Sequence, residues 1–222
     1  MPFSAALLDL DGTLLNTIPD LADATNAMRL EMGLPPLRQD VISTYVGKGT
    51  DTLVRRALSD DLSQPPDDGR LAQGLALFRR RYHLINGDKT LLYPGVLEGL
   101  KAFREQDVRM AVVTNKPDEF TRPLLERTGL AHFFDHVVCG DTCARKKPDP
   151  LPLLHACRLL GVAPGATLAI GDSINDAAAA RAAGITILAV PYGYNEGRGV
   201  QSLEVDDIVT SIDEAARWAL RH

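Results

Sequence analysis

The chain has 222 residues, of which 45% are hydrophobic and 24% are charged, and its formal net charge at pH 7 is -5. This composition is typical of an acidic globular protein and lacks the basic excess of duplex-binding domains, so we expect no nucleic-acid partner. No run of roughly 18 apolar residues occurs, and residues 1–12 lack the pattern of a signal peptide. We therefore expect a cytoplasmic protein with no membrane partner, and both a monomer and a homodimer stay open.

Two acids follow the first predicted strand. The segment Ala5–Leu15 reads AALLDLDGTLL. Residues i and i+2 of an extended strand point to the same side, about 6.5 to 7 Å apart, so Asp9 and Asp11 should face one small space. Neighbouring carboxylates in a low dielectric are costly without a cation, which predicts a divalent metal. The pattern D-x-D-G also begins an EF-hand loop, but here the glycine comes too early and a strand precedes the acids.

The elements after this strand fall into two groups along the chain. Up to about residue 86, apolar spacing and turn residues predict only helices, with the turn-rich Gly47–Gly49 and the polar segment 63–69 between them. These helices are Ile18–Met32, Asp40–Val46, Thr50–Leu58 and Leu71–Leu84. From Tyr93 onward strands and helices alternate, which is typical of a parallel α/β sheet. The strands are Met110–Val113, Val137–Cys139, Thr167–Ile170, Ile185–Val190 and Asp207–Val209; the helices are Val96–Gln106, Glu119–Arg127, Leu151–Leu160, Asn175–Ala183 and Ile212–Arg221.

This order predicts an α/β fold, a doubly wound parallel sheet with a small all-helical cap inserted after its first strand. The core would comprise residues 1–15 and 87–222, and the cap would comprise residues 16–86. Ligands of such sheets bind beyond the carboxyl ends of the strands. Polar loops follow the strand runs that end at Leu8, Val113, Cys139 and Ile170. We expect these four loops to form one site.

The second and third loops carry groups suited to an anion. Thr114 and Asn115 directly precede a helix, where a hydroxyl and backbone N–H groups could bind phosphate, although the same residue types also cap helices. In the third loop, which reads RKKPDP, the prolines that follow Lys147 favour an extended chain at the head of a helix. Most basic runs are solvated surface, but a lysine at this strand end could bind phosphate and offset the charge of Asp9.

The fourth loop, GDSINDAAAARAAG, contains two further acids. Asp176 falls in the first turn of a helix, where the helix dipole favours an acid and gives a purely structural explanation. Asp172 ends an apolar strand, and the dipole explains it less well. A Mg²⁺ ion shared with Asp9 would explain it, because magnesium prefers one or two carboxylates, waters and a phosphate oxygen.

Together the four loops resemble the motifs of the haloacid dehalogenase superfamily, in its phosphatase branch. The matching segments are DLDGT at 9–13, TN at 114–115, KPDP at 147–150 and GDSIND at 171–176. The resemblance implies a Rossmann-like core, a Mg²⁺ cofactor, Asp9 as nucleophile and Asp11 as general acid and base. Dehalogenases of this superfamily lack an acid two residues after the nucleophile, so Asp11 favours phosphoryl chemistry. The other implied roles are substrate binding by Thr114, Asn115 and Lys147, metal binding by Asp9, Asp172 and the Asp11 carbonyl, and support by Ser173 and Asp176.

The cap and two further segments indicate a substrate. VGKGT at 46–50 and PYGYNEG at 191–197 resemble the bacterial phosphoglycolate phosphatase family, which implies 2-phosphoglycolate, a small phosphorylated metabolite. Lys48, with Gly47 and Gly49 on either side, could bring a cation and backbone N–H groups to the substrate carboxylate, or could be an exposed lysine in a turn between helices. Another small phosphoester or sugar phosphate, a phosphomutase reaction and a non-catalytic phosphate-binding module stay open as alternatives.

Overall fold

A six-stranded parallel sheet forms the centre of the larger part of the molecule. The structure is a computed structural model and describes residues 3–59 and 66–222. The strands are β1 (Ala5–Leu8), β4 (Arg109–Val113), β5 (His136–Val138), β6 (Thr167–Gly171), β7 (Thr186–Ala189) and β8 (Asp207–Ile208). Their order is β5-β4-β1-β6-β7-β8, and every neighbouring pair is parallel. The chain therefore winds outward from β1 in both directions, and the predicted doubly wound fold is confirmed.

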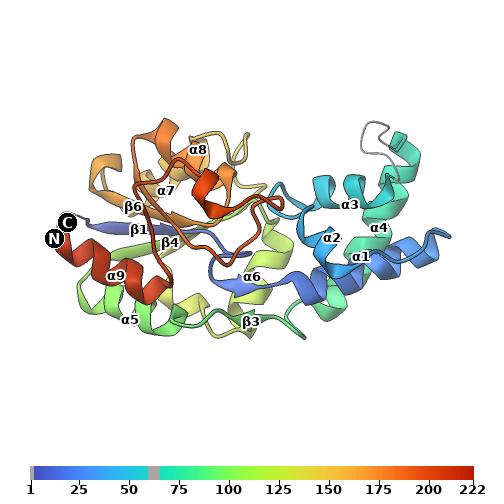
Figure 1. The fold of residues 1–222 in the computed structure, drawn as a ribbon, viewed down its shortest axis with the longest axis horizontal. Coiled ribbons are helices and arrows are strands. Elements are labelled where there is room, and N and C mark those ends of the chain that lie inside the picture. The colour runs from blue at the N-terminus through green and yellow to red at the C-terminus, as the bar shows by residue number, and fades with distance from the viewer. Residues whose placement is uncertain (1–2, 60–65) are drawn as a thin grey trace.

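Helices cover both faces of this sheet (Figure 1). In β1, Ala6 and Leu8 join the apolar cluster on the side of α5 and α9, whereas Ala5 and Leu7 join the cluster on the side of α7 and α8. A strand buried on both faces reads as continuously apolar, which explains the run AALL. The bounds are α5 (Val96–Glu105), α6 (Asp118–Arg127), α7 (Leu151–Leu160), α8 (Ile174–Ala183), α9 (Ile212–Arg221), and the short 3₁₀ turns η1 (Ala131–Phe133), η2 (Pro164–Ala166) and η3 (Val200–Ser202).

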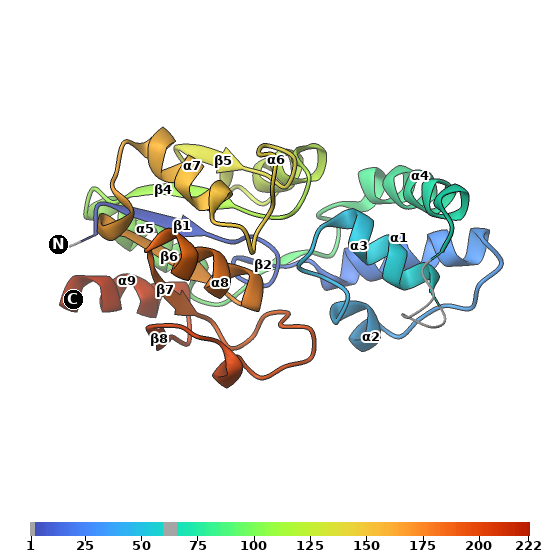
Figure 2. The same cartoon turned by 90° about the horizontal axis from the view of Figure 1, so that it is seen from above.

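Four further helices form a separate helical unit beyond the carboxyl ends of the strands, at the opposite end of the molecule from the two termini (Figures 1 and 2). They are α1 (Ile18–Glu31), α2 (Gln39–Ser43), α3 (Thr50–Leu58) and α4 (Asp68–Ile85). They bury their own apolar cluster, which includes Met28, Phe78 and Tyr82. Phe120 of α6 and Tyr194 also belong to this cluster, so the helical unit packs against the rest of the protein. The proposed division into residues 1–15 with 87–222 and residues 16–86 stays a prediction.

Two short segments connect the helical unit to the sheet. β2 (Leu15–Asn16) pairs antiparallel with β3 (Leu91–Leu92), so the departing and returning chains lie side by side. Asp20 lies fully buried nearby and accepts hydrogen bonds from the Lys89 N–H at 2.9 Å and the Thr90 hydroxyl at 2.7 Å. The sequence did not predict this pair, because two residues are too few to show a strand period.

Most of the other elements differ from prediction by a few residues at their ends. Three predicted helices, Thr50–Leu58, Leu151–Leu160 and Ile212–Arg221, have the observed bounds. Helix α4 begins three residues earlier than predicted, because the Asp67 carboxylate accepts a hydrogen bond from the Arg70 N–H and caps it. The last residues of the polar segment 63–69 therefore belong to α4, and residues 63–65 lie outside the described part of the chain. No helix among the described residues combines the length and apolarity that crossing a membrane requires.

Candidate active site

The four polar loops meet in one cavity between the sheet and the helical unit. Its volume is about 490 Å³, which includes space that is open to solvent. The core contributes Asp9, Asp11, Thr114, Asn115, Lys116, Lys147, Ser173 and Asp176, and the helical unit contributes Leu21, Val46, Gly47, Gly49, Thr50, Leu53 and Tyr82. The structure thus brings together residues that are up to 167 positions apart in the sequence, from Asp9 to Asp176.

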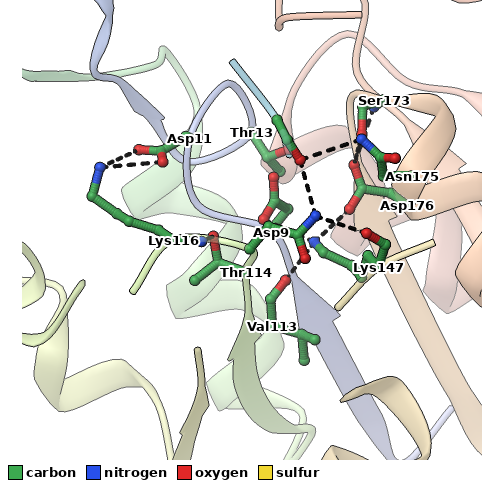
Figure 3. Close-up of polar contacts among 12 residues, drawn as sticks. Asp9, Asp11, Thr13, Val113, Thr114, Lys116, Lys147, Ser173, Asn175 and Asp176 are labelled. Carbon is green, nitrogen blue, oxygen red and sulfur yellow. Dashed lines mark hydrogen bonds and ion pairs between the residues drawn. The ribbon is translucent and has the colours of Figure 1, made fainter. Parts of the chain in front are cut away.

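Lys147 joins two of the acids (Figure 3). Its ammonium donates to Asp9 Oδ1 at 2.9 Å, to Asp176 Oδ1 at 2.5 Å and to the Val113 carbonyl at 2.6 Å. The lysine side chain is only 4% exposed. Burial lowers the pKa of Lys147, but the carboxylates of Asp176 and Asp9 more than offset this effect, so its pKa is raised and the group stays charged. The prediction that a lysine at this strand end offsets the charge of Asp9 is therefore confirmed.

The acids at the strand ends form a candidate metal centre. Burial raises the pKa of Asp9 to about 6, with Lys147 opposing the rise and Asp176 adding to it. Burial also raises the pKa of Asp172 well above its ordinary value, and Asp176 and Asp9 reinforce the effect. Carboxylate oxygens of Asp9, Asp172 and Asp176 lie within 4.8 Å of one another. Such a buried set of hard oxygen ligands fits a divalent cation, which would relieve their mutual repulsion.

Two hydrogen bonds and two glycines fix the position of Asp172. Its Oδ1 accepts from the Thr13 hydroxyl at 2.8 Å, and its Oδ2 accepts from the Tyr194 N–H at 2.5 Å. A Cβ on Gly12, whose φ is 91°, would lie 2.5 Å from Asp172 Oδ2. A Cβ on Gly193 would lie 2.2 Å from Asp172 Cβ. Both positions must therefore lack a side chain for the backbone to come so close.

Asp176 has a structural and an electrostatic role at once. Its Oδ2 accepts hydrogen bonds from the hydroxyl and the N–H of Ser173, at 2.6 and 3.1 Å, at the start of α8. Its Oδ1 accepts from Lys147. The helix-start explanation is therefore correct, but it accounts for only one of the two carboxylate oxygens.

Thr114 and Asn115 do not cap the helix that follows them. Helix α6 begins at Asp118 with Pro117 at its N-cap position, so the capping alternative is wrong. The Thr114 hydroxyl accepts from the Lys116 N–H at 3.2 Å. The Asn115 Nδ2 donates to the carbonyls of Gly47 and Lys147, both at 2.9 Å, and so links the helical unit to the third loop. The Asn115 Oδ1 is buried and has no hydrogen-bond partner among the described residues. Substrate binding by these two residues stays a prediction.

Sequence reasoning missed the partner of Asp11. The Lys116 ammonium donates to both Asp11 carboxylate oxygens, at 3.1 and 3.2 Å, and to the Tyr82 hydroxyl at 2.8 Å. Burial lowers the pKa of Lys116, but Asp11 and Tyr82 more than offset it, so its pKa is raised. The metal contact of Asp11 through its backbone carbonyl stays a prediction. The signal available in the sequence was the position of Lys116 directly after the TN motif.

Lys48 lies beside the cavity with its charge paired elsewhere. Its neighbours Gly47 and Gly49 line the cavity. The Lys48 ammonium lies 2.8 Å from Glu196 Oε1, which also pairs with Arg56 at 2.7 Å, and the lysine side chain is 37% exposed. The structure therefore brings the backbone of this segment to the cavity, and substrate binding by Lys48 stays a prediction.

A parallel doubly wound sheet, an inserted helical unit and an acid–lysine cluster at the strand ends define an α/β protein with a candidate cation and phosphate site at the carboxyl edge of its sheet. The chain belongs to the haloacid dehalogenase-like hydrolase family, whose model matches residues 6–190. The resemblance noted in the sequence is thereby confirmed.

Similarity to known proteins extends over nearly the whole chain. A protein of Thiobacillus denitrificans named phosphoglycolate phosphatase is 48% identical over 216 residues, which cover 97% of this chain and 95% of that protein. A protein of the same name from Nitrosospira multiformis is 49% identical over 217 residues, which cover 98% of this chain and 96% of that protein. The crystal structure of a predicted phosphoglycolate phosphatase from Haemophilus somnus 129pt superimposes with a TM-score of 0.93 at 31% identity and covers 99% of both chains.

Proposed function

We propose that this protein is a Mg²⁺-dependent phosphatase that hydrolyses 2-phosphoglycolate to glycolate and phosphate. The observation that carries the proposal is the pairing of each of two acids, Asp9 and Asp11, with its own buried lysine in one cavity. Relatives that are 48% and 49% identical and carry the name phosphoglycolate phosphatase support the choice of substrate. The site lies at the carboxyl ends of the strands, where open α/β sheets bind their ligands.

The first step forms a phosphorylated enzyme. A carboxylate oxygen of Asp9 attacks phosphorus, and the bond from phosphorus to the leaving oxygen breaks. For this step Asp11 must carry a proton in place of its ion pair with Lys116, and it gives that proton to the leaving oxygen and so releases glycolate. Lys147 already contacts Asp9 and is in place to stabilise the equatorial phosphate oxygens, and Thr114 would donate its hydroxyl to them.

The second step restores the enzyme. Asp11, now a carboxylate, takes a proton from a water molecule, whose oxygen attacks phosphorus while the acyl phosphate bond of Asp9 breaks. A covalent route fits the chemistry, because hydrolysis of phosphate monoesters needs accelerations of up to about 10²¹, whereas general acid–base catalysis contributes about 10² to 10⁴. Mg²⁺, held by Asp9, Asp172 and the Asp11 carbonyl, would supply neutralisation of phosphate charge. Asp176 keeps Lys147 in position.

The proposed partner is the small phosphorylated metabolite alone. The net charge of -5 speaks against nucleic acid. We propose a cytoplasmic enzyme that acts as a monomer or homodimer without a membrane partner.

The test is phosphate release from a panel of small phosphoesters, with Mg²⁺ or with EDTA, by the wild type and by Asp9→Asn. We expect the wild type to prefer 2-phosphoglycolate and to stop in EDTA. Asp9→Asn should lower kcat by at least about 10³-fold, because it removes the nucleophile. The matched control is Asp68→Asn, an exposed acid of α4, which should behave as the wild type does. Equal rates across the panel would contradict the substrate, and an active Asp9→Asn would contradict the covalent route.

A further inference from the structure

Two buried lysines line the cavity, and the proposed mechanism uses only one of them. Lys147 lies against Asp9 and Asp176, whereas Lys116 lies against Asp11 and Tyr82. Figure 3 shows the Asp11–Lys116 pair at the left of the view and the Asp9–Lys147 pair near its centre. The cavity thus holds one cation beside the proposed nucleophile and a second beside the proposed general acid.

The position of Lys116 fits the far end of a short substrate. The mechanism puts phosphorus beside Asp9 and the leaving oxygen beside Asp11. In 2-phosphoglycolate a single CH₂ group separates that oxygen from the carboxylate, so the carboxylate must lie just beyond Asp11. The Lys116 ammonium, 3.1 Å from Asp11 Oδ1, is the cation at this place.

The surroundings of Lys116 favour the binding of an anion. Its side chain is 4% exposed, so water screens its charge weakly. The neutral hydroxyl of Tyr82, in α4, accepts a hydrogen bond from the ammonium at 2.8 Å, and the centroid of the Tyr82 ring lies 4.8 Å from the ammonium. Gly49 and Thr50, at the start of α3, line the same cavity, and α3 has no side-chain cap at its N-terminus. Its first N–H groups could therefore also face an anion.

We propose that Lys116 binds the carboxylate of the substrate and thereby selects small phosphoesters that carry a carboxylate. This inference rests on the proposed phosphatase function and assigns its specificity to a residue of the core. Tyr82 is a positioning residue for Lys116, so the helical unit acts on specificity through the core lysine. The competing candidate is Lys48, which does not line the cavity and whose side chain is 37% exposed, against 4% for Lys116.

The test compares Lys116→Met with the wild type on 2-phosphoglycolate and on 2-hydroxyethyl phosphate, an ester of similar length without a carboxylate. For 2-phosphoglycolate, kcat/KM should fall about 10- to 100-fold more than for 2-hydroxyethyl phosphate, with most of the difference in KM, because only the first ester loses a charge-assisted hydrogen bond. Lys116→Arg should recover part of the preference. Lys101→Met, an exposed lysine of α5, is the matched control.

Each alternative predicts a different result. An equal fall on both esters would show that Lys116 acts only through Asp11, and would overturn the inference while leaving the phosphatase function intact. Loss of the preference in Lys48→Met but not in Lys116→Met would overturn it in favour of Lys48. A wild type that prefers 2-hydroxyethyl phosphate would refute the proposed substrate and the inference together. Calorimetric binding of 2-phosphoglycolate to Asp9→Asn, with and without Lys116→Met, gives a readout that needs no turnover, and unchanged affinity would also refute the inference.

Discussion

Gly193→Ala should damage the candidate metal centre although it replaces none of the ligands. The added Cβ would lie 2.2 Å from Asp172 Cβ, 2.4 Å from its Cγ and 2.3 Å from its Oδ2, whereas ordinary contacts begin at 3.4 Å. The two segments must separate by about 0.8 Å to bring this contact to 3.0 Å, and by about 1.2 Å to make it an ordinary one. Magnesium demands near-ideal geometry with bonds of about 2.0 to 2.1 Å, so a shift of this size should raise the half-saturating Mg²⁺ concentration about 10- to 100-fold. Misplacement by about 1 Å can also lower kcat about 10²-fold.

The assay is phosphate release from 2-phosphoglycolate as Mg²⁺ is titrated. Gly165→Ala is the matched control, because a Cβ at that position meets nothing within 4 Å, and its kinetics should match those of the wild type. Circular dichroism and thermal unfolding without Mg²⁺ separate a damaged site from a damaged fold. A folded Gly193→Ala protein with wild-type kcat and Mg²⁺ dependence would refute the reasoning that close packing of residue 193 positions Asp172.

Two further predictions concern stability. Burial raises the pKa of Asp9 to about 6, so protonation of Asp9 stabilises the folded, metal-free protein. This stabilisation is complete below about pH 4 and is lost as the pH rises through about 6. Mg²⁺ should therefore raise the melting temperature more at about pH 7.5 than at about pH 5, and equal increases would contradict this. Asp20→Asn should lower the free energy of unfolding by about 3 kcal/mol in denaturant titrations, because the buried carboxylate accepts hydrogen bonds from Lys89 and Thr90. Asp23→Asn, whose carboxylate pairs with the exposed Lys89 ammonium, should cost less than about 1 kcal/mol, and equal losses would contradict the role of burial.

The sequence predicted the sheet and most of the site, because both depend on short-range patterns. A strand buried on both faces has a continuous apolar run such as AALL, and parallel strands place the loops that follow them at one edge of the sheet. The acids and the lysine that follow such runs, Asp9, Asp172 and Lys147, could therefore be assigned to one place. The GDSIND segment likewise placed Asp176 in the first turn of a helix, where it lies.

Only the tertiary structure shows which residue each acid contacts. Lys116 and Asp11 are 105 positions apart, and Tyr82 comes from the helical unit, so no local pattern relates them. Gly193 matters because its loop packs against Asp172. Leu15–Asn16 pairs with Leu91–Leu92 because the chain leaves the sheet for the inserted helices and returns from them at the same place.

The amino-acid sequence by itself determined the order of the longer strands and helices and the kind of residue at each strand end, because these follow from periodicity and from the chemistry of neighbouring residues. The tertiary structure alone decided that Lys147 lies against Asp9 and Lys116 against Asp11, because the contacts of a side chain depend on how distant segments pack in three dimensions.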